Sequence, residues 1–449
     1  MPALFWLWNR SSEWWVAFGT MMLAAMTFLL AFVTVFRDSI RSRFFRPRLK
    51  KTLCPLLAGV FGMASVNLHA ADQPKPMTAR LVAEVAPSSL PESGKDSHIT
   101  AFDVAPDGSL LAVLYVTWPT RTSFGLSAAI WDISRKAAVE HSQIGVHEVL
   151  APGAPLIDDE VIFTGDKKYL LVLGLGKVWI LDATTCNVVR PVEPPRSGLG
   201  PPVRILMAGT SALAVTYKQG YNNYYVGLFE IPRARTVAGW GSSSLPQTFS
   251  PDGTLAAEPD AEHYNEGGVK NLLLMDARTG LKIRSIPIGF GFRKWESDEE
   301  KGSFTARFLD NQLIVVTPDN MVDHTGHHSA NSMEVINIAE NRVVREIAPK
   351  NFGPTGELAM SPDRNHFVVY SHYVSASAKL SDGLWPDFHK PELSLFRTDD
   401  TKPELVIPDL KADGAVAHLR NMILPSLSND ASIVAVAQLG AVKVFQTKE

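Results

Sequence analysis

The chain has almost no cysteine: Cys54 and Cys186 are the only two among 449 residues. Cys54 lies in an apolar stretch near the N-terminus, and Cys186 stands alone downstream. A disulfide within the downstream region is therefore excluded, as are a C-x-x-C-H haem attachment and a thiolate zinc site. This scarcity does not exclude export, because a chain of this length can bury a large core without covalent cross-links.

Surplus charge and catalytic motifs are also missing. The formal net charge of −3 and the isoelectric point near 6.5 exclude the basic footprint of a nucleic-acid-binding domain, so we expect no nucleic-acid partner. No G-x-S-x-G elbow, H-E-x-x-H pair, Walker A loop or G-x-G-x-x-G after a strand occurs in the sequence. These absences favour a non-catalytic protein without a cofactor, and an enzyme of another class is kept as an alternative.

The N-terminal part contains two apolar runs, at 14–36 and 52–71, on either side of a basic segment at 37–51. In one interpretation both runs cross a membrane, and the positive-inside rule places the basic segment in the cytoplasm. In the other, 41–71 is a signal peptide that ends in small residues. Both interpretations place the rest of the chain in the periplasm, either anchored to a bacterial inner membrane or secreted after cleavage. Residues 72–77 are expected to form a linker.

One strand–turn–strand pattern recurs through residues 78–449. Seven apolar runs end in a polar pair, at 128–134, 177–185, 225–233, 271–280, 333–341, 393–400 and 442–449. Another short apolar run precedes each copy, and before that lies a turn such as "FSPDG" (249–253) or a degenerate form of it. Proline presets the first corner of such a turn, aspartate can bond its own backbone, and glycine accepts the left-handed position.

A fourth apolar run follows six of the seven copies, while the seventh copy ends the chain. The run at 78–86 is left over, and it can supply the missing strand. We therefore predict an all-β fold: a seven-bladed β-propeller closed by an N-terminal strand and preceded by one or two N-terminal membrane or signal helices. Closure of the ring would remove most exposed strand edges.

The Pro-Asp-Gly turns and "IWDIS" at 130–134 resemble WD-repeat and WD-like bacterial propellers over roughly 78–449. Only Trp131–Asp132 provides a Trp-Asp pair at the end of a third strand, and no Gly-His pair opens a blade. The resemblance implies a surface for binding other proteins. Such propellers also resemble lactone hydrolases and amine-dehydrogenase subunits, so an enzyme with a site at the channel mouth is one alternative. A glycan-binding propeller is another.

Extra chain length concentrates in the connections between second and third strands, which we expect to emerge on one face. Trp, Tyr and Arg anchor many interfaces, and these connections and one long linker between blades carry several of them. The candidate binding residues are Trp118, Arg121, Tyr264, Arg293, Trp295, Trp385 and His389. The alternative is that these aromatic side chains fix their own loops.

A weaker candidate is a metal site at Asp323, His324 and His327. Its spacing matches no standard metal motif, and a solvated loop is the simpler interpretation. The leading hypothesis is a scaffold that binds a periplasmic protein partner through its long-loop face and reaches the membrane through its N-terminal helix. Binding of a small ligand is a further alternative.

Overall fold

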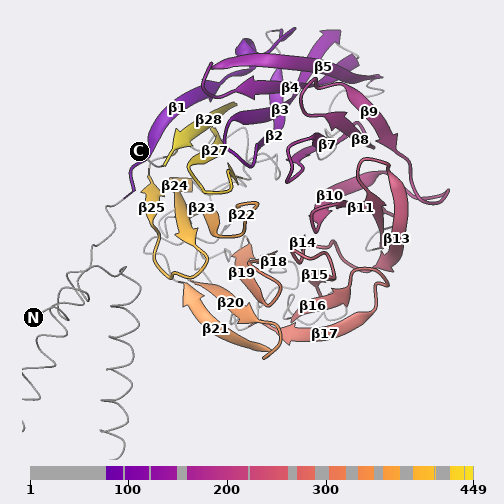
Figure 1. Cartoon of the computed structure of the whole chain (residues 1–449), viewed down its shortest axis with the longest axis vertical. Helices are drawn as coiled ribbons and strands as arrows, with labels where there is room; N and C mark the ends of the chain where they lie inside the picture. The colour runs from indigo at the N-terminus through magenta and orange to yellow at the C-terminus, as the bar shows by residue number, and fades with distance from the viewer. Residues whose placement is uncertain are drawn as a thin grey trace, which may run out of the picture. The chain divides into compact units, whose positions relative to one another are not determined.

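The structure is a computed structural model. It describes residues 77–94, 97–120, 123–148, 159–220, 223–260, 271–288, 303–319, 332–347, 357–374, 388–408, 410, 425–438 and 440–447. These residues belong to the unit Pro76–Glu449. They form seven four-stranded antiparallel sheets arranged as blades around a centre, which confirms the all-β, seven-bladed propeller (Figure 1).

In the first four blades the strands follow chain order from the centre outward. Blade 1 contains β2 (His98–Val104), β3 (Leu110–Thr120), β4 (Ser123–Asp132) and β5 (Ala137–Glu148). Blade 2 contains β6 (Glu160–Phe163), β7 (Tyr169–Gly174), β8 (Lys177–Asp182) and β9 (Val188–Val192). Blade 3 contains β10 (Pro202–Ala208), β11 (Ala212–Lys218), β12 (Tyr224–Glu230) and β13 (Arg235–Ser242). Blade 4 contains β14 (Thr248–Phe249), β15 (Leu255–Pro259), β16 (Asn271–Asp276) and β17 (Lys282–Pro287).

The remaining blades complete the ring. Blade 5 contains β18 (Ser303–Phe308), β19 (Leu313–Asp319), β20 (Met333–Asn337) and β21 (Arg342–Ile347). Blade 6 contains β22 (Glu357–Met360), β23 (His366–Val374), β24 (Phe388–Arg397) and β25 (Leu405–Ile407). Blade 7 contains β26 (Ser426–Leu427), β27 (Ile433–Gln438) and β28 (Ala441–Gln446), and β1 (Arg80–Val85) pairs with β28 as its outer strand. A single 3₁₀ turn, η1 (Pro87–Ser89), follows β1 within the described chain.

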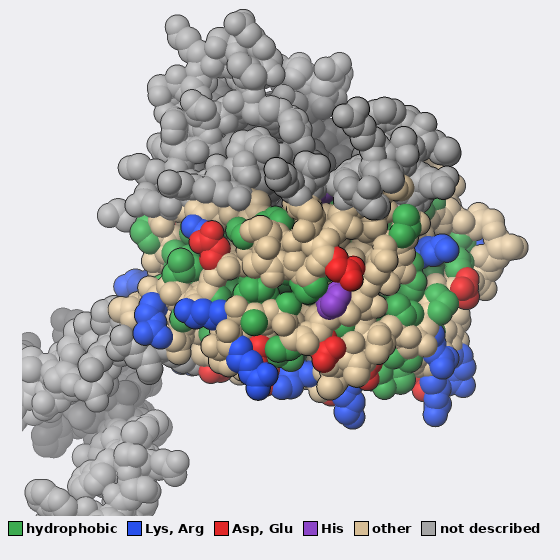
Figure 2. All heavy atoms as spheres, turned by 90° about the horizontal axis from the view of Figure 1, so that it is seen from above, with side chains coloured by type: hydrophobic (Ala, Val, Ile, Leu, Met, Phe, Trp, Pro, Cys, Tyr) green, Lys and Arg blue, Asp and Glu red, His purple; other side chains and the backbone are tan. Residues whose placement is uncertain are grey.

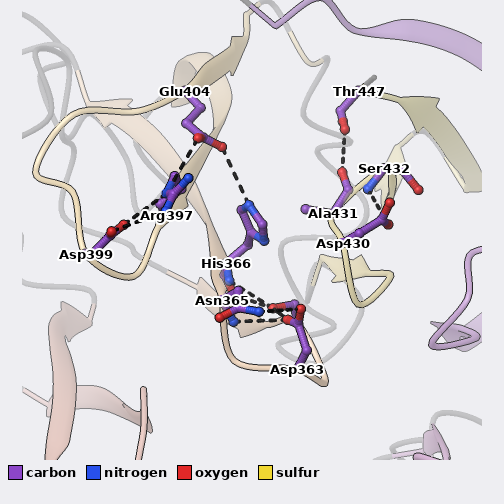
Figure 3. Close-up of polar contacts among 11 residues, drawn as sticks. Asp363, Asn365, His366, Arg397, Asp399, Glu404, Asp430, Ala431, Ser432 and Thr447 are labelled. Carbon is purple, nitrogen blue, oxygen red and sulfur yellow. Dashed lines mark hydrogen bonds and ion pairs between the residues drawn. The ribbon is translucent and has the colours of Figure 1, made fainter. Parts of the chain in front are cut away.

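The recurring turn works as its residues predict. Asp252 Oδ1 accepts the backbone N–H of Thr254 at 3.0 Å, and Gly253 takes a φ of +71°. Asp363 in blade 6 and Asp430 in blade 7 bond the N–H two residues ahead in the same way (Figure 3). Each turn therefore leads a first strand directly into a second strand. We call the side of the ring with these turns the turn face, and the opposite side, where second strands lead to third strands, the loop face.

The apolar core lies between blades. Seven clusters of buried side chains are present, and each joins two blades that are neighbours in the ring. One of them contains Leu171 of blade 2 and Phe229 of blade 3, both fully buried. Because every blade is packed on both sides, the ring is a rigid support for whatever lies on its two faces.

Among the described residues, three arginines on outer strands connect blade 2 to blade 3, blade 4 to blade 5 and blade 5 to blade 6. They occupy the same position in their blades: Arg190, Arg284 and Arg345. In each blade the arginine pairs with the third-strand residue that lies two positions before the end of that strand. Arg284 Nη1 donates to the carbonyl oxygens of Ile338 at 2.5 Å and Ala339 at 2.9 Å in blade 5. Arg190 and Arg345 likewise donate to carbonyl oxygens of the following blade. These contacts lock neighbouring blades at the outer rim.

The expected N-terminal helices, the basic segment and residues 72–76 of the expected linker lie outside the described residues. Within the described chain, no helix has the length and apolar character needed to cross a membrane.

Candidate functional site: loop face and central channel

Only two of the predicted binding residues lie on described strands. Trp118 lies in β3 and His389 lies in β24, where His389 pairs with Tyr373. The side chains of both lie outside the described part of the structure, as do the other five binding candidates and the three metal candidates. These are Arg121, Tyr264, Arg293, Trp295, Trp385, Asp323, His324 and His327. In the described part, no group of three or more His, Cys, Asp or Glu side chains is arranged to hold a metal ion.

Blades 1 and 6 have longer strands than the others toward the loop face. β3 and β4 contain 11 and 10 residues, and β23 and β24 contain 9 and 10, whereas β7 and β8 of blade 2 contain 6 each. Trp118 and His389 lie in these extensions. Blade 7 separates blades 1 and 6 in the ring, and its β27 and β28 have 6 residues each. Two long hairpins therefore flank one short hairpin.

A channel of about 340 Å³ runs through the centre and is lined by first strands of all seven blades. The strand registers define one equivalent position on every first strand, and all seven of its occupants line the channel. From blade 1 to blade 7 these residues are Asp103, Ile162, Leu206, Thr248, Arg307, Ala359 and Ser426. We call this set the channel ring. Its two charged members belong to blades 1 and 5, on opposite sides of the centre in Figure 1.

Asp103 joins three blades through one carboxylate. Its Oδ2 accepts the backbone N–H of Phe163 in blade 2 at 2.7 Å, and its Oδ1 accepts the hydroxyl of Ser426 in blade 7 at 2.6 Å. Removal of the carboxylate from water raises the pKa of Asp103 to about 6, while these hydrogen bonds act in the opposite direction. Asp103 therefore has a structural role in closing the ring, and its charge changes near pH 6.

Two other members of the channel ring also accept a backbone N–H from the next blade through a side-chain oxygen. Ser426 Oγ accepts the N–H of Val104 at 2.9 Å, and Thr248 Oγ1 accepts the N–H of Phe308 at 3.4 Å. The channel-ring residue of blade 2 is Ile162, whose side chain has no acceptor. Glu160 makes the corresponding bond to blade 3, because its Oε2 accepts the N–H of Ile205 at 2.7 Å. Each bond satisfies a backbone donor that the first strand would otherwise present to the channel.

The opposite wall is basic. Arg307 Nη1 donates to the carbonyl oxygens of Gln247 at 2.8 Å and Ala306 at 2.9 Å. Arg364, from the blade 6 turn, donates through Nη1 to the carbonyl oxygen of Phe308 at 2.7 Å. Partial burial lowers the pKa of Arg364, since its charge has lost part of its water. The channel is thus acidic along blades 1 and 2 and basic along blades 5 and 6.

A second buried carboxylate lies between blades 3 and 4, next to the connection that carries Tyr264. Glu258 is 1% exposed, and its Oε2 accepts the hydroxyl of Ser242 at 2.7 Å. Burial, together with the nearby charge of Asp260, raises the pKa of Glu258 to about 7, while hydrogen bonds from Ser242 and Ser244 act in the opposite direction. Asp260 Oδ2 lies 3.8 Å from Lys282 Nζ. Glu258 is therefore divided between its neutral and charged forms at physiological pH.

Exposed charge elsewhere on the ring is mixed. Lys and Arg side chains gather along one edge of the side view, with carboxylates between them (Figure 2). Among the described residues, Arg235 pairs with Glu230 at 2.8 Å, and in blade 6 Arg397 contacts both Asp399 and Glu404 (Figure 3). This mixture gives no uniformly charged surface in the described chain, and such exposed pairs add little stability.

The sequence interpretation missed the channel residues and the outer arginines. A signal for the arginines exists, because two apolar or basic residues precede each in "NVVR", "LKIR" and "RVVR". The channel ring also has a local signal, since its members directly precede the last first-strand residue before the turn in six blades. Which of these residues lie opposite a charged residue across the channel depends on how the ring closes, and the local sequence does not show it.

No protein-family model matches this chain. No curated protein matches it in sequence. Among solved structures it is similar to a chain in "Crystal Structure of Mitotic Checkpoint Complex", with a TM-score of 0.48 and 13% identity over 85% of this chain and 97% of that chain. These values are too low for that protein's partners to be transferred to this one.

Proposed function

We propose that this propeller is a non-catalytic scaffold that binds a protein partner through its loop face. The observation that carries the proposal is the extension of β3–β4 and β23–β24 beyond the strand length of the other blades. Blades packed on both sides hold these hairpins in place, and rigid supports with variable connections are a common way to build a binding surface. The candidate aromatic residues Trp118 and Trp385 belong to these two blades.

Site-specific photo-crosslinking tests the proposal. A photoreactive amino acid at position 118 or 385 of the full chain should capture one dominant protein in intact cells. The matched control places the same group at Thr279, an exposed turn-face position between β16 and β17. Equal labelling from all three positions, or none from the loop face, would remove the loop face from consideration.

A deletion provides the second arm. Replacing 375–387 with a short Gly-Ser linker should abolish capture at position 118 while the β-sheet circular dichroism and the melting temperature stay close to those of the parent. Capture that survives this replacement would contradict a partner site shared by blades 1 and 6.

We also propose that the propeller is exported to the periplasm of a bacterium and is anchored, or was directed there, by its N-terminal segment. Support comes from the uncharged run at 14–36 and the seven basic residues in 37–51. Alkaline phosphatase folds only in the periplasm, so a fusion after Glu449 should be active in intact cells. An inactive but full-length fusion would refute export.

A further inference from the structure

The last residue of the recurring turn, which is Gly253 in "FSPDG", takes a left-handed backbone in five blades. Gly108 and Gly253 occupy it in blades 1 and 4 with φ of +71°, and Ala431 occupies it in blade 7. Lys167 and Arg364 occupy it in blades 2 and 6, with φ of +58° and +65°. Glycine adopts this backbone without strain, whereas a long side chain does not. Ala431, Lys167 and Arg364 are therefore exceptions with a cost, and each of the two basic side chains can offset that cost through a contact.

Lys167 has such a contact, because its Nζ forms an ion pair with Asp107 in the turn of blade 1. In the turn of blade 5 the equivalent aspartate is Asp310, which accepts the backbone N–H groups of Gln312 and Leu313. Arg364 instead donates to the carbonyl oxygen of Phe308. A carbonyl orients a guanidinium without neutralising its charge. Within the described residues, no carboxylate lies within ion-pair distance of Arg364.

Arg364 also differs from Lys167 in its surroundings. Arg364 lines the central channel, together with Gly165 and Thr210 from the turns of blades 2 and 3, so it lies at the turn-face mouth. Burial alone accounts for its lowered pKa, with no acidic group acting against it. A partly desolvated cation without a counter-charge is unfavourable, and a bound anion would offset that cost. The planar guanidinium matches a carboxylate or phosphate group.

The rest of the channel restricts what the anion can be. Ile162, Leu206 and Ala359 supply aliphatic surface at the channel ring. On the other wall Asp103, Asp159 and Glu160 line the channel together with Arg204, whose Nε lies 4.0 Å from Glu160 Oε1. Carboxylates outnumber the cation on this wall and would repel a second negative charge on the ligand. The volume of about 340 Å³ lies at the lower end of the range typical for small-molecule sites.

We propose that the turn-face mouth of the channel binds a small organic monoanion, with its oxyanion on Arg364 and its apolar body against the aliphatic part of the channel ring. Arg307 lines the same wall and adds positive potential. The site is on the opposite side of the ring from the proposed partner surface and does not depend on it.

The test is isothermal titration of the full-length protein with hexanoate, and with hexylamine and inorganic phosphate as comparison ligands. Chemical shifts of methyl-labelled methionine report the location, because Met207 and Met360 line the channel. We expect hexanoate to bind and to shift these methyls, and phosphate and hexylamine to bind at least tenfold more weakly.

Two matched variants separate the site from the fold. Arg364→Gly introduces the residue that blades 1 and 4 already carry, so it should fold, and it should weaken hexanoate binding at least tenfold. Lys167→Gly changes the equivalent turn outside the channel and should leave binding unchanged. Absence of hexanoate binding to the folded parent, or equal binding by Arg364→Gly, overturns the proposal. Binding of phosphate as tight as that of hexanoate overturns the apolar part of the site, and equal binding of hexylamine overturns the role of charge.

Discussion

The Ser426 hydroxyl of blade 7 donates to the Asp103 carboxylate of blade 1 across 2.6 Å, although 323 positions separate the two residues. The same hydroxyl oxygen accepts the N–H of Val104. One side chain thus satisfies a donor and an acceptor at the place where the last blade meets the first. The junction between the two ends of the ring is held by polar contacts at the channel as well as by apolar packing.

Ser426→Ala should destabilise the ring by about 1–3 kcal/mol, because it leaves a buried N–H and a buried carboxylate oxygen without their partner. Ser426 is 8% exposed, so water cannot readily replace the hydroxyl. Urea unfolding measures the change. Ser89→Ala is the control, since the Ser89 hydroxyl is exposed and should matter by less than about 0.5 kcal/mol. Equal losses in both variants would contradict a role for the junction.

The pH dependence of stability should change in Asp103→Asn. The folded-state pKa of Asp103 is raised to about 6, so between about pH 4 and pH 6 the native state binds more protons than the unfolded state. Its contribution is therefore full at low pH and is lost as the pH rises through 6. The free energy of unfolding should fall less steeply over this window in the variant.

Asp182→Asn is the control of opposite sign. Hydrogen bonds from the backbone of Thr185 and Thr184 hold the pKa of Asp182 below its usual value. Its contribution is present above about pH 4 and is lost as the pH falls, so this variant should lose stability chiefly at neutral pH. The same slope in both variants would contradict the assignment to Asp103.

The outer arginines should contribute more to stability than nearby arginines that make no contact with the next blade. Arg284→Ala removes two hydrogen bonds to blade 5 carbonyl oxygens, and we expect a loss of about 1–2 kcal/mol. Arg278→Ala, on an exposed turn of the same blade, should change stability by less than about 0.5 kcal/mol. Thermal unfolding of the two variants side by side gives the comparison, and a smaller loss for Arg284→Ala would refute the role of the rim contacts.

Pairing of β1 with β28 can be tested on a single strand. Val85 is fully buried against blade 7 and blade 1, whereas Leu81 is 47% exposed. Val85→Asp places a carboxylate in the core and should release β1, which would raise amide hydrogen exchange in β28. Leu81→Asp should leave exchange close to that of the parent. Protected β28 amides in Val85→Asp would show that blade 7 is stable without β1.

The number and type of blades followed from the sequence because the signal for a blade is local. "FSPDG" encodes one turn through Asp252 and Gly253, and the flanking apolar runs are too short for helices. The same chemistry repeats in each blade, so errors at one copy do not change the count. Degenerate turns, as at 164–168, still fit because Lys167 adopts the left-handed backbone.

The channel was less accessible to sequence reasoning because its geometry is non-local. Asp103 is one polar residue among many until the ring brings it against Ser426 and Phe163. In the sequence, Arg364 only replaces the glycine of the recurring turn. The structure shows that Lys167 at the same position pairs with Asp107, whereas Arg364 has no carboxylate partner among the described residues. The loop-face candidates, including Trp118 and Trp385, remain predictions.

The pairing of β1 with β28 also has a consequence for synthesis. Arg80 and Gln446 contact each other across 366 positions, so β1 leaves the ribosome long before its partner exists. At about 5–20 residues per second the delay is about 20–70 s. During that time β1 is a free strand with unsatisfied backbone groups, and copies on one polysome carry it in close proximity. A nascent-chain holdase that covers residues 80–85 would prevent such copies from exchanging strands before the ring is complete.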